Sequence, residues 1–208
     1  MTRTTRIASI LIAILILTAI YLPAAGQRAA FQLVTNESFE AQNGANPSLS
    51  PWTLKTPSGD KIACNDKAPS VQHGVCAFMF KGSIGESARL IQRATNLDMM
   101  NTALVQGPGS IDLQFKYYSD KNASSLDARV KVKYTMPGNP TVLIAKKNSH
   151  ITGKSDDGGS VAWVGRGLEQ MVTVPQSATI LSVKYIFSNT STAGKLFIDE
   201  VYGVFYTS

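Results

Sequence analysis

The chain has 208 residues, of which 44% are hydrophobic and only 16% are charged, and its formal net charge is +6. This length fits one ordinary domain or two small ones, and the apolar content excludes a disordered chain. Two cysteines and two histidines leave little material for a transition-metal site with several such ligands. The sequence has no sustained helical repeat and only one long apolar stretch, which excludes coiled coils and multispanning membrane proteins.

The first 26 residues have the pattern of an export signal. Arg3 and Arg6 give a positive start, residues 7–22 form an apolar run, and Pro23 then breaks any helix. The small residues 24–26 fit a cleavage site before Gln27. We therefore predict a signal peptide over residues 1–26 and a mature domain over residues 27–208.

An uncleaved membrane anchor is the alternative to cleavage. The apolar run of residues 7–22 is shorter than the roughly 20 residues that span a bilayer, which favours cleavage. Either outcome places residues 27–208 outside the cytoplasm, so we expect a secreted or cell-surface protein that meets the membrane only through this segment. Cleavage removes two arginines and no acid, so the net charge falls from +6 to +4.

Beyond the signal, apolar residues alternate with polar ones, which is typical of half-buried strands. Clusters of glycine, proline, asparagine and serine separate these segments, and only residues 96–102 suggest a helical turn. We find no internal repeat and no linker. The fold class predicted from this pattern is all-β: one antiparallel β-sandwich. Strands are expected at residues 31–35, 52–55, 75–81, 87–93, 110–119, 127–136, 141–145, 168–174, 179–189 and 195–206.

The longest strands also predict which side chains face the core. The nearly continuous apolar run at residues 195–206 indicates a central strand covered on both faces. In residues 110–119, Asp112, Gln114 and Lys116 are expected to face away from the core. The core-facing residues predicted for three strands are Ile111, Leu113, Phe115 and Tyr117; Val130, Val132 and Tyr134; and Leu181, Val183, Tyr185 and Phe187.

The best candidate for a basic surface is formed by Arg129, Lys131 and Lys133, which alternate along one strand. Nucleic-acid binding requires a concentrated basic face, and three residues fit a solvated outer face better. We therefore expect no nucleic-acid partner. Contact of the same residues with an anionic polysaccharide or a cell wall remains open.

Cys64 and Cys76 are the only cysteines and lie twelve positions apart. An even count in an exported chain predicts a disulfide between them. The spacing does not match the CxxC pattern of redox-active pairs, so the disulfide is expected to be structural.

Two terminal motifs carry a resemblance to a known family. Residues 33–40 read LVTNESFE and precede Trp52, and residues 196–202 read LFIDEVY. This pairing resembles the jelly-roll carbohydrate-binding modules that are appended to bacterial xylanases and cellulases. The resemblance extends over residues 31–206, although the middle of the chain matches only in its strand pattern. It implies a jelly-roll sandwich whose first and last strands are neighbours, and it implies that Trp52 packs in the core.

The resemblance also implies a structural calcium ion. In the family, a glutamate of the N-terminal motif and an aspartate of the C-terminal motif help to hold the ion, and Glu40 and Asp199 occupy these positions. Carboxylates are ligands that calcium prefers, and Asn36 could add a further oxygen. The alternative is that Glu40 and Asp199 are ordinary turn and strand-end acids.

Sugar binding requires aromatic faces for stacking and planar polar groups that recognise hydroxyls. Trp163 lies in a glycine-rich segment, where it is either an exposed platform or a plug over the sandwich. Tyr118 and Gln114 fall on the polar face of their strand. We predict these three residues as ligand contacts.

No catalytic motif stands out, so we expect a non-enzymatic protein. The predicted function is a secreted module that binds a poly- or oligosaccharide, with a carbohydrate or cell-wall glycan as its partner. The alternative is a structural or adhesive surface domain that binds protein or cell wall without a specific sugar site.

Overall fold

The computed structural model describes residues 30–43, 46–57, 59–64, 74–85, 87–153, 155 and 163–207. The predicted signal peptide lies outside these residues. Among them, no helix combines the length and apolar character needed to cross a membrane.

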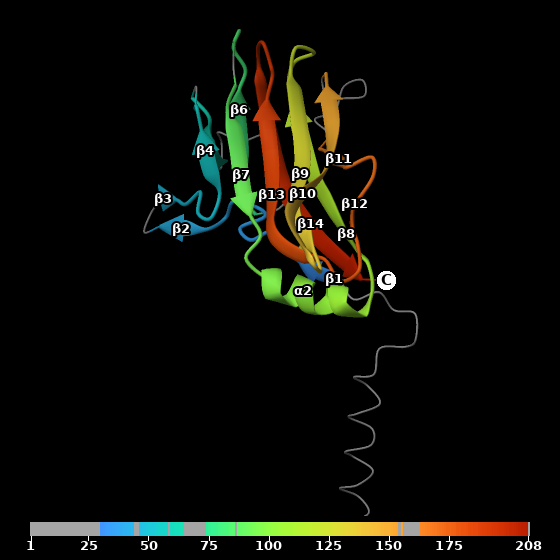
Figure 1. Cartoon of the computed structure of the whole chain (residues 1–208). Helices are drawn as coiled ribbons and strands as arrows, with labels where there is room; N and C mark the ends of the chain where they lie inside the picture. Colours follow the sequence, from blue (N-terminus) through green and yellow to red (C-terminus); the bar gives the residue numbers. More distant parts are fainter. Residues whose placement is uncertain are drawn as a thin grey trace, which may run out of the picture.

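Two antiparallel sheets pack face to face to form a β-sandwich, which confirms the predicted fold class (Figure 1). A short hairpin, β2 (Gln42–Asn43) and β3 (Asn46–Pro47), stands apart from both sheets. The five-stranded sheet has the order β10 (Asn139–Thr152), β9 (Ser125–Met136), β13 (Thr179–Asn189), β7 (Arg89–Arg93) and β4 (Thr53–Lys55). The seven-stranded sheet has the path β11 (Val164–Gly167), β8 (Gly109–Ser119), β14 (Lys195–Thr207), β6 (Cys76–Lys81) and β5 (Lys61–Cys64), with β1 (Ala30–Gln32) beside β14 and β12 (Val172–Val174) beside β8.

The first and last strands are neighbours, as the resemblance implies. Strand β1 pairs with β14, with Ala30 opposite Tyr206. Further along, the backbone N–H of Val201 donates to the carbonyl of Glu37 at 3.0 Å. These contacts hold the N-terminal loop against the C-terminal strand.

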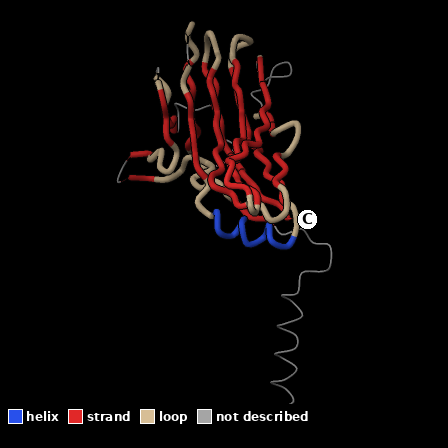
Figure 2. Tube along the Cα trace, in the orientation of Figure 1, coloured by secondary structure: helices blue, strands red, loops and turns tan. Residues whose placement is uncertain are grey.

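The core between the sheets is built from the alternating residues that the sequence predicts. The inward positions of β8 and β9 are buried, except that Tyr134 is only partly buried at the margin of the core. Trp52 packs against Phe39 and Phe187, as expected for a core residue. A ten-residue helix, α2 (Leu97–Gln106), closes one end of the sandwich (Figure 2). The predicted turn at residues 96–102 is therefore the start of a longer helix, whose Met100 and Leu104 are buried in the core.

Several expected strands differ in extent from those in the structure. Of the strand expected at residues 168–174, only residues 172–174 form a strand, β12, while β11 lies at residues 164–167, where no strand is predicted. Both β11 and β12 pair with β8. The strand expected at residues 141–145 lies in the first half of β10, a 14-residue edge strand. The alternation of apolar and polar residues is weak in β10, because both faces of a strand at a sheet edge are accessible to solvent and can carry polar residues.

The prediction that Leu181 faces the core is wrong. A register shift between Ile180 and Ser182 places Ile180 in the core and leaves Leu181 45% exposed. From Val183 onward, the inward residues of β13 are buried as predicted. A β-bulge inserts one residue and moves a side chain to the other face, which alternation alone cannot reveal.

Candidate functional site

A cavity of about 500 Å³ opens on the outer face of the seven-stranded sheet, where β8, β11 and β14 meet. Its volume lies within the range of small-ligand sites, which is roughly 300–1,000 Å³. It is lined by Asp112, Gln114, Phe115, Lys116, Gly165, Arg166, Gly167, Leu168, Glu200 and Tyr202.

A bulge in β14 brings Tyr202 to this cavity. Asp199 lies opposite Lys116, but the next paired residue is Tyr202, which lies opposite Gln114. Glu200, inside the bulge, has a left-handed backbone with φ of 46°. The bulge turns Val201 into the core and leaves Tyr202 on the outer face, 40% exposed. The expectation that this strand is covered on both faces is therefore wrong at Tyr202.

Polar side chains of β8 and β14 converge on the same cavity. Gln114 Nε2 donates to Asp112 Oδ2 at 2.9 Å, and this bond fixes the orientation of the amide. Lys116 Nζ lies 4.0 Å from Glu200 Oε2. Burial, followed by the carboxylates of Glu200, Glu37 and Asp199, raises the pKa of Tyr202 above its ordinary value.

Gly165 keeps the β11 side of the cavity open. A methyl group added at Gly165 would meet no atom within 4 Å, so the space beside its backbone is unfilled. The next residue, Arg166, stacks its guanidinium over the ring of Tyr117 at 5.6 Å and donates to the Gly165 carbonyl at 3.1 Å. The cavity thus combines an aromatic ring, fixed amide and charged groups, and an open glycine wall.

A small apolar cluster lies on the same outer face. Tyr118 and Trp163 are partly buried, with ring centroids 6.1 Å apart, and Tyr118 also packs against Phe197 at 6.0 Å. Trp163 therefore covers part of the sheet, which favours the plug over the isolated platform. Beneath the two rings lie Ala63, Ala77, Met79 and Phe197.

All three predicted ligand contacts thus lie on the outer face of one sheet, but only Gln114 lines the cavity itself. Sequence reasoning missed Tyr202, because the nearly continuous apolar run at residues 195–206 predicts a strand that is covered on both faces. The signal that could have revealed it is the acidic pair Asp199 and Glu200, which interrupts an otherwise apolar strand.

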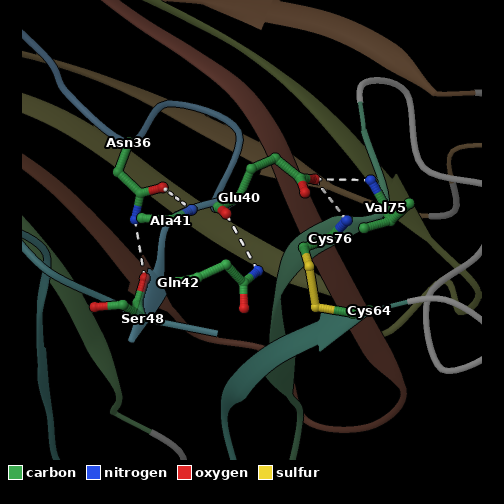
Figure 3. The surroundings of a disulfide bond; sticks show 8 residues. All are labelled: Asn36, Glu40, Ala41, Gln42, Ser48, Cys64, Val75 and Cys76. Atoms are coloured by element: carbon green, nitrogen blue, oxygen red, sulfur yellow. Dashed lines mark hydrogen bonds between the residues drawn. A yellow bond between two sulfur atoms is a disulfide. The ribbon is translucent and has the colours of Figure 1, made fainter. Parts of the chain in front are cut away.

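The disulfide between Cys64 and Cys76 is confirmed and joins directly opposed residues of β5 and β6. Glu40 lies beside it, as Figure 3 shows: Glu40 Oε1 accepts backbone hydrogen bonds from Val75 at 2.8 Å and Cys76 at 2.7 Å. The carboxylate therefore secures the N-terminal loop to the start of β6.

Asn36 and Asp199 also make hydrogen bonds to the backbone. Asn36 Nδ2 donates to the carbonyls of Ser48 and Ser50, both at 3.0 Å. Its Oδ1 accepts from the backbone N–H of Ala41, and Figure 3 shows this bond and the bond to Ser48. Asp199 is fully buried, and its Oδ1 accepts from the backbone of Glu200 at 2.8 Å.

These bonds bear on the expected calcium site. Among the described residues, no three His, Cys, Asp or Glu side chains gather where they could hold a metal. A calcium ion here would be held by the carboxylates of Glu40 and Asp199 together with backbone carbonyls. The side chain of Asn36 holds its loop through three bonds, which leaves only a second lone pair on Oδ1 for a metal.

No family model matches the chain, and no curated protein matches it. Solved structures do resemble it. One is TmCBM61 in complex with β-1,4-galactotriose, with a TM-score of 0.50, 15% identity, and coverage of 83% of this chain and 97% of the other. Another is a candidate sugar-binding protein from Bacteroides thetaiotaomicron VPI-5482, with a TM-score of 0.50, 12% identity, and coverage of 86% and 100%.

A third similar structure is the enzymatically active domain of tailspike protein 4 from bacteriophage CBA120. Its TM-score is 0.53 at 15% identity, and the match covers 83% of this chain but 21% of the other. At such identities the similarity concerns the fold. The two sheets, their antiparallel pairing and the adjacent terminal strands agree with it: the chain has the jelly-roll β-sandwich fold found in carbohydrate-binding modules.

Proposed function

We propose that this chain is a non-catalytic module that binds a poly- or oligosaccharide through the outer face of its seven-stranded sheet. The observation that carries the proposal is the cavity of about 500 Å³ in which Tyr202 and the polar groups of β8 converge. A pyranose ring can stack on Tyr202, while Gln114 and Lys116 meet its hydroxyls. Similarity to TmCBM61, which was solved with β-1,4-galactotriose, supports the same class of ligand.

The test is isothermal titration calorimetry with β-1,4-galactan and xylan oligosaccharides, preceded by a glycan array. We expect Tyr202→Ala and Gln114→Ala to weaken binding at least tenfold, because each removes a contact that the other cannot replace. Trp163→Ala and Tyr118→Ala measure how far the ligand extends over the apolar cluster. Thermal melts of every variant establish that it is folded.

Gly165 provides a sharper control. A leucine at this position enters open space and fills the cavity, whereas an alanine leaves most of the cavity free. We expect Gly165→Leu to abolish binding and Gly165→Ala to retain most of it. Equal binding by wild type, Tyr202→Ala and Gly165→Leu would contradict the proposed site.

We further propose that the module is exported, with residues 1–26 as its signal, and that a calcium ion bound by Glu40 and Asp199 stabilises it. The hydrogen bond from the backbone N–H of Val201 to the carbonyl of Glu37 supports the calcium proposal, because it joins the two motifs. Detection of the mature N-terminus at Gln27 by mass spectrometry of culture medium tests export.

A further inference from the structure

Basic side chains form a continuous row across the outer face of the five-stranded sheet, on the side opposite the cavity. Lys131 lies directly opposite Lys146 on one neighbouring strand and Lys184 on the other, and Lys184 lies opposite Arg93. Four adjacent strands thus each contribute one cation to a single row that runs across the sheet, perpendicular to the strands. With strands about 4.8 Å apart, the row extends over about 14 Å.

The row is part of a larger surface, which we call the basic face. Further cations on the same outer side of the sheet lie on β4, β7 and β9, and Lys55 lies directly opposite Arg89, which adds a fourth cation pair. Among the described residues, no carboxylate forms an ion pair with any cation of the face; Asp127 is paired instead with His150 at 2.6 Å. The basic face consists of Lys55, Arg89, Arg93, Arg129, Lys131, Lys133, Lys146 and Lys184.

This arrangement has a cost in stability, because like charges directly opposite each other on neighbouring strands repel. The guanidinium of Arg93 lowers the pKa of Lys184, with further contributions from burial and from Lys133, Lys131 and Lys55. A bound polyanion would offset this repulsion, and the charge complementarity would also steer its approach.

A second observation on the same face is a hollow of about 260 Å³. Arg89 and Arg129 lie at its sides, while Ile91 and Ile186 contribute apolar surface between them. Guanidinium groups suit carboxylates and sulfates because they offer paired N–H donors in one plane. The remaining lining residues carry hydroxyl, amide or carboxylate groups: Ser87, Asp127, Ser188, Asn189 and Thr190.

We propose that the basic face binds an acidic polysaccharide, with one acidic sugar in the hollow between Arg89 and Arg129 and the row of cations along the following sugars. Regular spacing of the cations suits a polymer with a charge on each repeating unit. Single-stranded nucleic acid is less suited to this surface, because the outward positions of the described strands β4, β7, β9 and β13 carry no aromatic ring for base stacking. This binding surface is separate from the proposed cavity and does not depend on it.

The experiment compares polygalacturonate with its methyl-esterified form, which has the same backbone without the charge. Binding is measured by affinity electrophoresis and calorimetry at low and at 0.5 M salt. We expect the full chain to bind polygalacturonate only, and salt to weaken the binding strongly. Lys131→Gln/Lys184→Gln and Arg89→Gln/Arg129→Gln should each weaken it at least fivefold.

The matched control is Lys61→Gln/Lys195→Gln, which removes the same charge from exposed positions on the seven-stranded sheet. Equal weakening in this control would overturn the proposal, because it would show that net charge alone explains the binding. Binding only to duplex DNA would overturn it as well. Binding only to phosphatidylserine–phosphatidylcholine vesicles would also overturn the proposal. An anionic membrane is the strongest alternative ligand, because the apolar side chains of Val142, Ile144 and Leu181 are exposed.

The two proposals can fail independently. Loss of neutral-glycan binding in Tyr202→Ala with intact binding to polygalacturonate supports two separate surfaces. Loss of both ligands in Tyr202→Ala, with no effect of the basic-face variants, would overturn the assignment to the basic face and leave the cavity as the site.

Discussion

Gly74 lies directly beneath the carboxylate of Glu40: a side chain at position 74 would overlap Glu40 Oε1. The glycine also has a left-handed backbone, with φ of 72°. Glycine at this position thus allows the carboxylate to reach the backbone N–H groups of Val75 and Cys76, beside the disulfide.

This relationship predicts that Gly74→Ala destabilises the fold by more than backbone strain alone. Gly138→Ala is the matched control, because Gly138 has a similar φ of 70° but no atom within 4 Å of an added methyl group. We expect Gly138→Ala to cost about 1 kcal/mol and Gly74→Ala about 2 kcal/mol more, through loss of the Glu40 hydrogen bonds. Urea denaturation measures both. In a Glu40→Ala background the excess cost of Gly74→Ala should disappear; an unchanged excess would refute the explanation.

The calcium proposal leads to a prediction about metal removal. If Glu40 and Asp199 hold the ion, excess EGTA should lower the melting temperature, and added calcium should restore it. Magnesium is the control, because its smaller ion demands a stricter octahedral geometry. A melting temperature that is the same with EGTA and with calcium would show that Glu40 acts only through its hydrogen bonds.

Tyr185 is buried in the core, and its hydroxyl has no hydrogen-bond partner among the described residues. Because an unpaired buried hydroxyl is costly, we expect Tyr185→Phe to keep or raise stability, by up to about 1 kcal/mol. Burial, with a smaller effect of Asp112, raises the pKa of Tyr185 above its ordinary value of 10.0. The unfolded chain therefore ionises first, and wild type should lose stability above pH 10 relative to Tyr185→Phe. Denaturation of wild type and Tyr185→Phe at pH 7 and pH 10.5 tests both statements. A Tyr185→Phe variant that is much less stable than wild type at pH 7 would contradict the first.

Because Lys184 lies opposite Arg93, we predict that the free energy of unfolding depends on salt and pH. Its pKa is lowered in the fold, so the repulsion with Arg93 is complete below that pKa and is relieved as pH rises toward 10.5. We expect Lys184→Gln to be about 0.5 kcal/mol more stable than wild type at pH 7 and low salt, with a smaller difference in 0.5 M salt or near pH 10.5. Chemical denaturation under these conditions measures the difference, and a less stable variant at pH 7 would refute the prediction.

The sequence predicts the class of fold well because most strands keep strict alternation, as in the residues of β8 from Ile111 to Tyr117. It predicts the disulfide because Cys64 and Cys76 have no other partners. Predictions fail where one inserted residue reverses the faces, at Leu181 and at Tyr202. The extent of the basic face could not be predicted either. Arg129, Lys131 and Lys133 share one strand, but their neighbours Lys146, Lys184 and Arg93 come from strands whose register no local pattern fixes.

The back-to-back arrangement of the two sheets determines how many ligands the domain can bind at the same time. The cavity at Tyr202 and the basic face at Lys131 point in opposite directions, and one rigid core separates them. A domain occupied on both sides would join two different glycan chains without a linker, and neither ligand would block access to the other. Gelation or co-sedimentation of a mixture of neutral and acidic polysaccharides would measure this cross-linking. A variant that keeps only one of the two binding surfaces should bind one polysaccharide without joining it to the other.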